Sequence, residues 1–366
     1  MPILQKIVIS NFRNIEFQEL EFSPKINCIW GNNGEGKTNL LDAVYYLSMT
    51  KSALGINDSF NCRHGQDGFS IAGTCQMPSA LTNRFSIVVK KGEEKKLRCD
   101  DKPYGRISEH IGKLPTVIIS PSDISLVSDS GEERRRFMNA VASQIDREYL
   151  SAIQQYNRLL AQRNRMLKDG VCDATLLEVI DIKMSSHADF IHRKRAELCE
   201  PLTEAVNEYY RRLSGGSESV SIRYRSDLDK APLEQLLKDS LEKDRIMKYT
   251  TVGIQRDDFI FEIDGYPIRR CGSQGQQKSF LLALKLAQFE LMRKAFGFAP
   301  ILLLDDVFDK LDMNRTRNLL EMVSSEDFGQ IFITDSNKLR LSSLVDGLTE
   351  DRAFFETVGG VFTRVE

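Results

Sequence analysis

Alternating apolar and polar residues dominate the first 120 positions of the chain. One run at 4–9 precedes the polar break NFRN at 11–14, and another at 17–22 leads to the apolar segment 26–30. Because successive side chains of a strand point to opposite faces, this alternation predicts half-buried strands. Further strands are predicted at 69–74, 84–90 and 95–98, and 116–120 is predicted as a short strand of buried type.

Helical spacing replaces the alternation between residues 131 and 214. Ser130 and Glu133 form a capping-box signal for the start of a long helix, and the segment 168–170 interrupts the pattern. Apolar residues in steps of three and four form a narrow seam on either side of that break, at Tyr149, Ile153, Tyr156, Leu160, Leu167, Leu177, Ile180, Met184, Ile191, Leu198 and Leu202. Such a seam predicts two antiparallel helices, each roughly 35–40 residues and ~50–60 Å long. The hairpin either projects as an arm or packs onto the body of the protein.

The last third of the chain returns to a mixture of strands and helices. Patterns of these kinds cover 220–224, 227–247, 258–263 and 301–306. Strands on both sides of a helical insertion favour an α/β head that is split in the sequence. We expect a head lobe from residues 1–130 and 215–366, with an inserted helical hairpin lobe at 131–214.

A glycine-rich loop follows the apolar segment 26–30. Gly31, Gly36, Lys37 and Thr38 fit the pattern G-x-x-x-x-G-K-[ST], and an amphipathic helix begins beside Lys37. Glycines let backbone N–H groups converge on phosphate oxygens, and the helix adds the positive end of its dipole. The pattern predicts a nucleoside-triphosphate site, whereas the alternative is a plain turn before a helix. The candidate nucleotide-binding residues here are Gly31, Asn32, Asn33, Gly34, Glu35, Gly36, Lys37, Thr38 and Asn39.

The apolar run 301–304 ends in the acidic pair Asp305 and Asp306. The carboxyl end of a buried parallel strand is where α/β sheets bind their ligands. We expect Thr38 and Asp305 to bind Mg²⁺, and Lys37 to reach the β- and γ-phosphates. Asp306 is expected to orient or deprotonate the attacking water. The candidate catalytic residues are therefore Lys37, Asp305 and Asp306.

A second candidate anion site is the segment CGSQGQQKS at 271–279, which precedes an apolar helix. The Ser273 hydroxyl, the Gly275 N–H and the helix dipole, with Gln276 beside them, can bind a γ-phosphate. Because the loop at 31–38 already surrounds the nucleotide, this site makes most sense across a dimer, with nucleotide between two subunits. The alternative is an ordinary polar helix cap.

The net charge of the chain does not indicate a polyanionic partner. The 366 residues carry a formal net charge of −2, so a nucleic-acid surface must come from local basic clusters. One cluster is Arg134–Arg136, and the other is a predicted hairpin. Each is either a solvated surface or a set of contacts to phosphate or carboxylate groups. The cations of the hairpin are Lys90, Lys91, Lys95, Lys96, Arg98 and Lys102.

Cysteine and hydropathy patterns favour a reducing, aqueous compartment. The seven cysteines form no C-x-x-C pair and the four histidines are dispersed, which argues against a disulfide framework or a zinc site. No stretch approaches the ~20 apolar residues of a membrane span. The N-terminus also lacks a charged region followed by a cleavage site. We expect a cytoplasmic protein that does not bind membranes.

In the order of its three motifs (the loop at 31–38, the segment 271–279 and the acidic pair after 301–304), the chain resembles the ABC-type ATPases of the SMC class. It most closely resembles the bacterial RecF family of DNA repair proteins. This resemblance implies an ABC-type P-loop ATPase head with a mixed sheet, and a short antiparallel coiled-coil lobe. It further implies ATP and Mg²⁺ as cofactors, and a loop at 308–312 that faces a partner subunit. The stretches that carry it are NFRN at 11–14, GNNGEGKTNLLDAVYYLS at 31–48, RRRFMN at 134–139, RDD at 256–258, GSQGQQKS at 272–279 and LLLDDVFDKLD at 302–312.

The resemblance also implies a role in recombinational gap repair and replication restart after DNA damage, within the SOS response. Members are expected to form head-to-head homodimers on DNA when ATP binds, and to release it by slow, DNA-stimulated hydrolysis. The expected partners are single-stranded and gapped or junction DNA, together with RecO and RecR in the loading of RecA.

Four positions depart from the pattern. Asp306 stands where ABC-type ATPases usually have Glu, and Gln255 stands where family members often have His. No His occurs near 334–335, the position of the usual switch residue, and the segment after Ser120 lacks a Q-loop glutamine. The shorter Asp306 carboxylate is expected to suit a slow, switch-like hydrolysis.

Two other functions fit a phosphate loop with an acidic strand. The ATPase subunit of a membrane transporter is disfavoured by the long internal hairpin. A nucleotide-binding scaffold without hydrolysis is disfavoured by the intact set Lys37, Thr38, Asp305 and Asp306.

Overall fold

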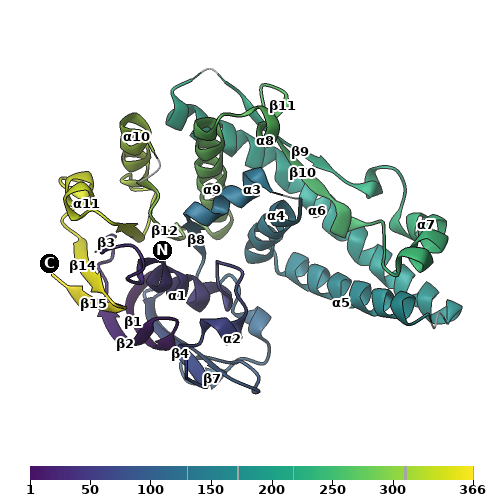
Figure 1. Cartoon of the computed structure of the whole chain (residues 1–366), viewed down its shortest axis with the longest axis horizontal. Helices are drawn as coiled ribbons and strands as arrows, with labels where there is room; N and C mark the ends of the chain where they lie inside the picture. The colour runs from purple at the N-terminus through teal and green to yellow at the C-terminus, as the bar shows by residue number, and fades with distance from the viewer. Residues whose placement is uncertain (130, 171–172, 217, 309–310, 366) are drawn as a thin grey trace. The chain divides into compact units, whose positions relative to one another are not determined.

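The chain forms two units in the computed structural model (Figure 1). Unit 1 comprises Met1–Asp123 and Gln288–Glu366, and unit 2 comprises Ile124–Ala287. The boundary between them falls inside helix α9 (Gln274–Phe296). The structure describes residues 1–129, 131–170, 173–216, 218–308 and 311–365.

The first sheet of unit 1 confirms the alternating strands of the N-terminal third. It is built from β1 (Ile3–Phe12), β2 (Ile15–Glu21), β4 (Gly68–Gln76), β5 (Thr82–Lys90), β6 (Lys96–Cys99) and β7 (Lys102–Pro103). These strands are antiparallel in the order β2-β1-β4-β5-β6-β7. Along β4, buried Phe69, Ile71 and Cys75 alternate with more exposed neighbours, so one face of the sheet lies on the core.

The second sheet of unit 1 holds the buried parallel strands. It is built from β3 (Ile26–Trp30), β8 (Thr116–Ile119), β12 (Ile301–Leu304), β13 (Ile331–Asp335), β14 (Arg352–Val358) and β15 (Val361–Arg364). The order is β15-β14-β3-β13-β12-β8, with β15 antiparallel to β14 and every other pairing parallel. The predicted mixed sheet is thereby confirmed.

Helix α1 (Lys37–Met49) packs against strands of both sheets and joins their cores. Its predicted apolar face, Leu40, Leu41, Val44 and Leu47, is fully buried. Burial of four such side chains is worth several kcal/mol, at ~1.5–3 kcal/mol each. The other helices that lie wholly in unit 1 are α2 (Asp58–Asn61), α10 (Met313–Val323) and α11 (Lys338–Val345).

Unit 2 is built on the predicted helical hairpin. Its helices are α3 (Ser125–Ser128), α4 (Gly131–Ile145), α5 (Arg147–Asp169), α6 (Ala174–Ser214), α7 (Leu233–Met247) and α8 (Ile268–Cys271), and α9 begins in it. Helices α5 and α6 pack side by side, and every predicted seam residue is buried or half-buried. Helix α7 lies against both of them, so the hairpin is not a bare two-helix coil.

A three-stranded antiparallel sheet completes unit 2. It contains β9 (Val220–Arg225), β10 (Asp258–Ile263) and β11 (Tyr266–Pro267), in the order β11-β10-β9. The N–H of Val220 donates to Asn207 Oδ1 of α6 at 2.9 Å, which ties this sheet to the hairpin. Residues after 214 therefore belong with the hairpin, and the inserted unit is wider than the expected 131–214.

The expectation of one continuous helix before the hairpin turn is wrong. Helix α4 ends at Ile145, and α5 starts after Asp146, whose carboxylate accepts the N–H of Tyr149 at 3.0 Å. An aspartate in this N-cap position satisfies a free N–H group and so favours a new helix start. Ser130 of the expected capping box lies outside the described residues.

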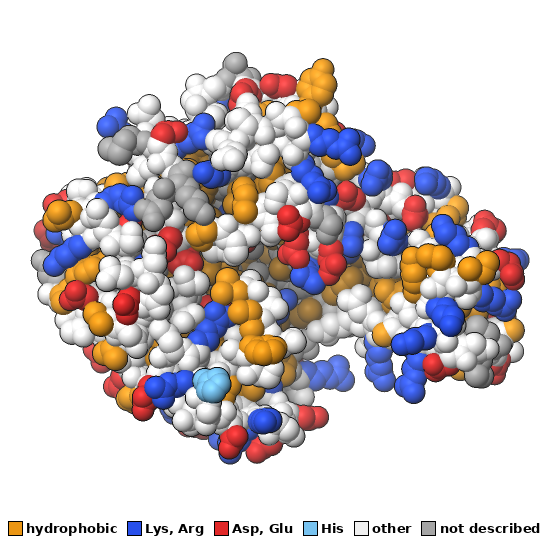
Figure 2. All heavy atoms as spheres, viewed as in Figure 1, with side chains coloured by type: hydrophobic (Ala, Val, Ile, Leu, Met, Phe, Trp, Pro, Cys, Tyr) orange, Lys and Arg blue, Asp and Glu red, His pale blue; other side chains and the backbone are white. Residues whose placement is uncertain are grey.

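Charged side chains of both signs are interspersed on the face shown in Figure 2, as the small net charge leads one to expect. Over the described residues, no helix is long and apolar enough to cross a membrane.

Candidate nucleotide-binding site

Parallel pairing brings the predicted loop and the acidic pair to one edge of the second sheet. Trp30 at the end of β3 pairs with Asp335 of β13, and Leu304 at the end of β12 pairs with Ile333 of the same strand. Gly31 and Asp305 therefore follow the carboxyl ends of the two strands that flank β13. This edge is where open α/β sheets bind ligands.

Two glycines of the loop are required by close approaches of neighbouring segments. A Cβ at Gly31 would lie 2.5 Å from the carbonyl oxygen of Thr357 in β14. Gly36 has φ 109°, in the left-handed region, and a Cβ there would lie 2.8 Å from the amide of Asn14. Any other residue at either position would push these contacts apart.

The first turn of α1 has no side-chain cap. Gly36 occupies the N-cap position and offers no side-chain acceptor, whereas Asp146, Asp173 and Asp312 cap the helices that follow them. The N–H groups at a helix start need acceptors, and phosphate oxygens supply them together with a charge that suits the helix dipole. Asn32, Asn33 and Gly34 form the exposed tip of the same loop.

Lys37 is held inside the loop that it follows. Its ammonium donates to the carbonyl oxygens of Gly31 at 2.8 Å and Asn32 at 3.2 Å, and the residue is only 4% exposed. The Asp306 carboxylate lies 3.9 Å from the same ammonium. A buried cation at the centre of a loop of backbone groups is positioned to contact phosphate oxygens.

Asp305 is the most strongly constrained carboxylate of the site. The Thr38 hydroxyl lies 3.0 and 2.9 Å from its two oxygens, and the Thr334 hydroxyl donates to it at 2.9 Å. Burial raises its pKa to about 6, and the neighbouring Asp306 adds to the rise, while the two threonines and Lys37 oppose it. A buried carboxylate beside a hydroxyl is a fitting oxygen donor set for Mg²⁺, which uses one or two protein oxygens together with substrate phosphates.

Asp306 is placed differently from its neighbour. Its backbone is left-handed, with φ 45°, and its N–H donates to Thr334 Oγ1 at 2.9 Å. The Thr334 hydroxyl therefore links the backbone of Asp306 to the carboxylate of Asp305. A non-glycine residue in this region of φ costs about 1 kcal/mol or more, and such strain is typical of functional sites. The half-buried Asp306 carboxylate is thus fixed near Lys37.

One backbone carbonyl of the loop, that of Glu35, accepts three hydrogen bonds. The donors are Asn14 Nδ2 at 3.2 Å, Thr357 Oγ1 at 3.2 Å and the N–H of Gly360 at 2.9 Å. The Glu35 carboxylate also accepts the N–H of Gly359. Glu35 is therefore bound to the β14–β15 turn, and its predicted role as a direct nucleotide contact stays a prediction.

Asn14 and Arg13 connect the β1–β2 turn to the start of α1. Asn14 Oδ1 accepts from Asn39 Nδ2 at 2.7 Å, and Arg13 donates to Asn39 Oδ1 at 3.1 Å. Arg13 also forms an ion pair of 2.7 Å with buried Asp42. The motif NFRN was recognised in the sequence, but no role could be given to it, because these contacts join segments more than 20 residues apart.

A match to the family described as RecF/RecN/SMC N terminal domain spans residues 3–349. The protein named DNA replication and repair protein RecF from Parabacteroides distasonis is 43% identical over 98% of this chain and 98% of its own length. The chain belongs to the RecF family. A solved structure of the recombination mediator protein RecF with ATP in the RecFOR pathway is 31% identical, with a TM-score of 0.90, and covers 100% of this chain and 98% of the other.

The head fold of this RecF family member is also that of the SMC class. The Smc head domain with an extended coiled coil from Pyrococcus furiosus gives a TM-score of 0.58 at 16% identity, and covers 100% of this chain and 96% of the other. The predicted ABC-type ATPase head with an inserted helical hairpin is thereby confirmed.

The Ser273 loop of this RecF family chain lies in unit 2 and forms a reciprocal helix cap. The N–H of Gln276 donates to Ser273 Oγ at 3.2 Å, and the N–H of Ser273 donates to Gln276 Oε1 at 2.7 Å. The Gln276 amide in turn donates to Glu218 at 2.6 Å. The alternative of a polar cap is thus present, and binding of a γ-phosphate by Ser273, Gly275 and Gln276 stays a prediction.

Two further RecF-family stretches, RRRFMN and RDD, meet inside unit 2. Arg134 binds the Asp258 carboxylate at 3.0 Å, and Arg135 donates to the carbonyl of Asp257 at 2.8 Å. Buried Arg195 binds the Asp257 carboxylate at 2.5 Å. Of the two alternatives left open for 134–136, contact with a carboxylate group is present at Arg134. Asp309 and Lys310 of the predicted partner-facing loop lie outside the described residues.

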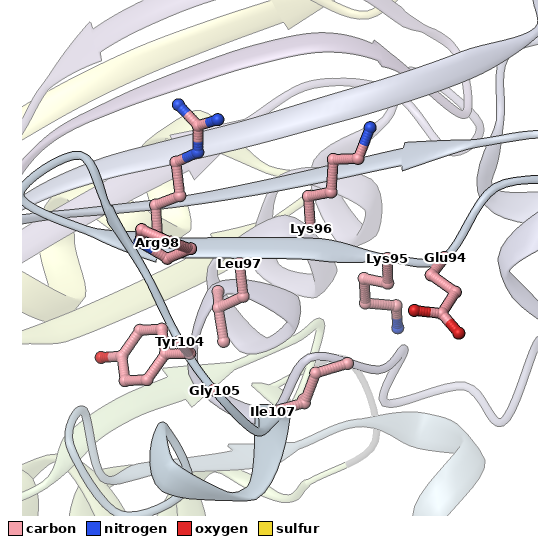
Figure 3. Close-up of a pocket in the computed structure, with 9 residues that line it drawn as sticks. Glu94, Lys95, Lys96, Leu97, Arg98, Tyr104, Gly105 and Ile107 are labelled. Carbon is pink, nitrogen blue, oxygen red and sulfur yellow. The ribbon is translucent and has the colours of Figure 1, made fainter.

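The cationic side chains of the basic hairpin (β5, β6 and β7) do not all point the same way. Lys95 binds the carbonyl of Thr50 at 2.5 Å and the carboxylate of Asp58 at 2.8 Å, so it holds structure together. Figure 3 shows Lys96 and Arg98 pointing to the opposite side of β6 from Leu97. A pocket of ≈ 570 Å³ is lined by Glu94, Lys95, Lys96, Leu97, Arg98, Pro103, Tyr104, Gly105 and Ile107.

Proposed function

We propose that this chain is an ATP-dependent DNA-binding protein of recombinational gap repair and replication restart, acting in the cytoplasm. Membership of the RecF family supports the repair role, because its relatives are named DNA replication and repair proteins. The observation that carries the ATP-dependent part is the cluster in which Thr38 and Thr334 hold Asp305, beside the buried Lys37.

Different residues of unit 1 serve phosphate binding, metal binding and hydrolysis at the proposed nucleoside-triphosphate site. The uncapped N–H groups of α1 and the Lys37 ammonium bind phosphate oxygens, and Thr38 and Asp305 would hold Mg²⁺. When bound, the metal ion neutralises negative charge on the β- and γ-phosphates. Asp306 orients the attacking water, and its short, constrained side chain suits slow, DNA-stimulated hydrolysis.

The Ser273 segment supplies the second wall of the site from a partner subunit. Nucleotide bound at the loop 31–38 of one chain is then closed by the helix start at Gln274 of another, which favours a homodimer on DNA. Hydrolysis removes the γ-phosphate and reopens the dimer. RecO and RecR are the proposed protein partners, in agreement with solved relatives that belong to the RecFOR pathway.

Two variants separate binding from hydrolysis. Lys37→Ala is expected to weaken ATP binding at least tenfold, because one buried charge-assisted contact is worth ~1.5–3 kcal/mol. Asp306→Asn is expected to bind ATP normally, to hydrolyse it at least tenfold more slowly, and to stay longer on gapped DNA. Lys102→Ala, on the exposed strand β7, serves as the matched lysine control.

The measurements are ATP affinity by calorimetry, phosphate release, and retention on gapped DNA with and without ATP. Unchanged ATP affinity in Lys37→Ala would refute the nucleotide site. If the wild-type chain is retained on DNA equally well with and without ATP, the ATP-dependent function is refuted.

A further inference from the structure

The outward face of α5 carries arginines without the acidic residues that usually accompany them. Between Glu148 and Asp169 the helix contains no acidic residue. Its exposed positions in that interval are occupied by small polar, amide and basic side chains and one alanine, namely Ser151, Gln154, Gln155, Asn157, Arg158, Ala161, Gln162, Arg165 and Lys168. In Figure 2 the margin of unit 2 that α5 forms in Figure 1 is mainly white and blue.

Three arginines of this face form one row along the helix. Arg147, Arg158 and Arg165 are all exposed and are separated by 11 and 7 residues. At 3.6 residues per turn these steps return to the same side of the helix within ~20°, and the row is ~27 Å long at 1.5 Å per residue. We call this set the α5 arginine row. Buried Tyr149, Ile153 and Tyr156 occupy the opposite side of the helix.

Other arginines of unit 2 are paired with carboxylates, either in the core or on the surface of a helix. Arg163 of the same helix is fully buried and binds Asp181 at 2.8 Å and Asp244 at 2.7 Å. Exposed Arg136 binds Glu132 at 2.5 Å, and exposed Arg211 approaches Glu208 to 3.2 Å. Intrahelical pairs of this kind are the ordinary way in which a solvated helix balances its charge.

The α5 arginine row lacks that balance. Within the described part of the chain, Arg147 and Arg158 have no carboxylate within ion-pair distance. Among the described residues Arg165 approaches one carboxylate, that of Asp169 at 3.7 Å, and both side chains are mostly exposed. A row of unbalanced guanidinium groups among amides and hydroxyls provides the donors that bind nucleic-acid phosphates. The face offers no aromatic ring on which an unpaired base could stack.

We infer that the α5 arginine row binds the sugar-phosphate backbone of double-stranded DNA, an inference that rests on the proposed DNA-binding function. At 3.4 Å per base pair the row matches ~8 base pairs of a duplex. Because backbone contacts carry no base readout, binding through this face is independent of sequence. The face therefore contacts the duplex part of a gapped or junction substrate, not its single strand.

The test compares the full chain with Arg147→Gln/Arg158→Gln/Arg165→Gln, in the presence of ATP. The probes are a fluorescent duplex of about 30 base pairs, long enough to cover the row, and the matching single strand. Loss of three phosphate contacts is expected to weaken duplex binding on the order of a hundredfold near 0.15 M salt, and to reduce the slope of log K against log salt by ~2.7. Single-strand affinity is expected to change little.

Two matched variants control the experiment. Arg193→Gln/Lys238→Gln/Lys243→Gln removes the same charge from exposed positions of α6 and α7 and is expected to bind duplex like the wild type. Arg147→Lys/Arg158→Lys/Arg165→Lys keeps the charge and is expected to stay within a few-fold of it. ATP affinity and Tm, measured for each variant, are expected to match the wild type, since no residue of the row supports the core.

The outcomes separate the two proposals. If the wild-type chain binds no DNA with ATP, the proposed function fails and the inference fails with it. If it binds DNA but the glutamine variant keeps the wild-type affinity and salt slope, only the inference is overturned. Equal losses in the α6–α7 control, or equal losses for single strand and duplex, also overturn it.

Discussion

Because Asp305 is buried, its ionised carboxylate lowers the stability of the ligand-free protein at neutral pH. Burial raises its pKa from 3.8 to about 6. In an unfolded chain the same group titrates near its ordinary value, so between about pH 4 and 6 the folded state binds the extra proton. The free energy of unfolding therefore falls as pH rises through this window. Above it, the ionised carboxylate destabilises the fold by about 3 kcal/mol, at 1.36 kcal/mol per pKa unit.

Asp305→Asn is accordingly expected to raise the Tm of the ligand-free protein at pH 7.5, because an amide needs no proton to stay neutral. The difference from the wild type is expected to shrink toward zero near pH 4, where Asp305 is itself neutral. Thermal unfolding at several pH values measures it. A variant that is less stable than the wild type at pH 7.5 would contradict the assignment of this cost to Asp305.

Single residues with local signals could be predicted from the sequence, and residues defined by distant partners could not. Lys37, Thr38 and Asp305 stand in recognisable patterns beside a strand, and the structure places them together. Thr334 was noted in the sequence only because the usual switch histidine is missing near 334–335, and no contact could be assigned to it. Its role depends on β13 lying next to β12, which only the folded sheet order establishes.

At the scale of elements, the β1–β2 turn supports the phosphate loop. Asn14 fills the space that Gly36 leaves open, donates to the Glu35 carbonyl and accepts from Asn39. Asn14→Ala removes both hydrogen bonds but leaves those from Thr357 and Gly360 to the same carbonyl. ATP affinity is expected to fall about fivefold, since one hydrogen bond contributes ~1 kcal/mol.

Asn83→Ala is the matched control for Asn14→Ala, because within the described residues its side-chain amide binds only Asp100, which follows β6. Titration with a fluorescent ATP analogue measures both variants. Equal affinities for Asn14→Ala and Asn83→Ala would show that the turn does not position the loop.

Element types followed the sequence patterns closely, and element boundaries did not. The period of two residues predicted β4, β5 and β10, and the three-four spacing predicted the buried seam of α5 and α6. The break at Asp146 was missed because the apolar spacing continues across it. Asp is a poor helix former inside a helix but a strong N-cap, and the apolar spacing does not show which of these positions it occupies.

At the scale of the whole molecule, the sequence could not delimit the units. Strands β9 to β11 look like head strands by pattern, yet they pack with α6, because Asn207 binds the backbone of Val220. The proposed composite nucleotide site draws its residues from both units. Lys37, Thr38, Asp305 and Asp306 belong to unit 1, whereas Ser273, Gly275 and Gln276 belong to unit 2. The proposal that they form one site across a dimer depends on the reach of Ser273 toward a partner's nucleotide.

Ser273→Asp tests that proposal without disturbing the fold. Aspartate caps helices as well as serine does, so the cap of α9 is retained, but its charge repels a γ-phosphate. The variant is expected to bind ATP as a monomer with wild-type affinity and to form no ATP-induced dimer in sedimentation velocity. Ser273→Thr, which keeps a neutral hydroxyl, is expected to dimerise. A normal ATP-induced dimer of Ser273→Asp would show that Ser273 does not contact the partner's nucleotide. The repulsion between a carboxylate and a phosphate in contact would otherwise prevent dimer formation.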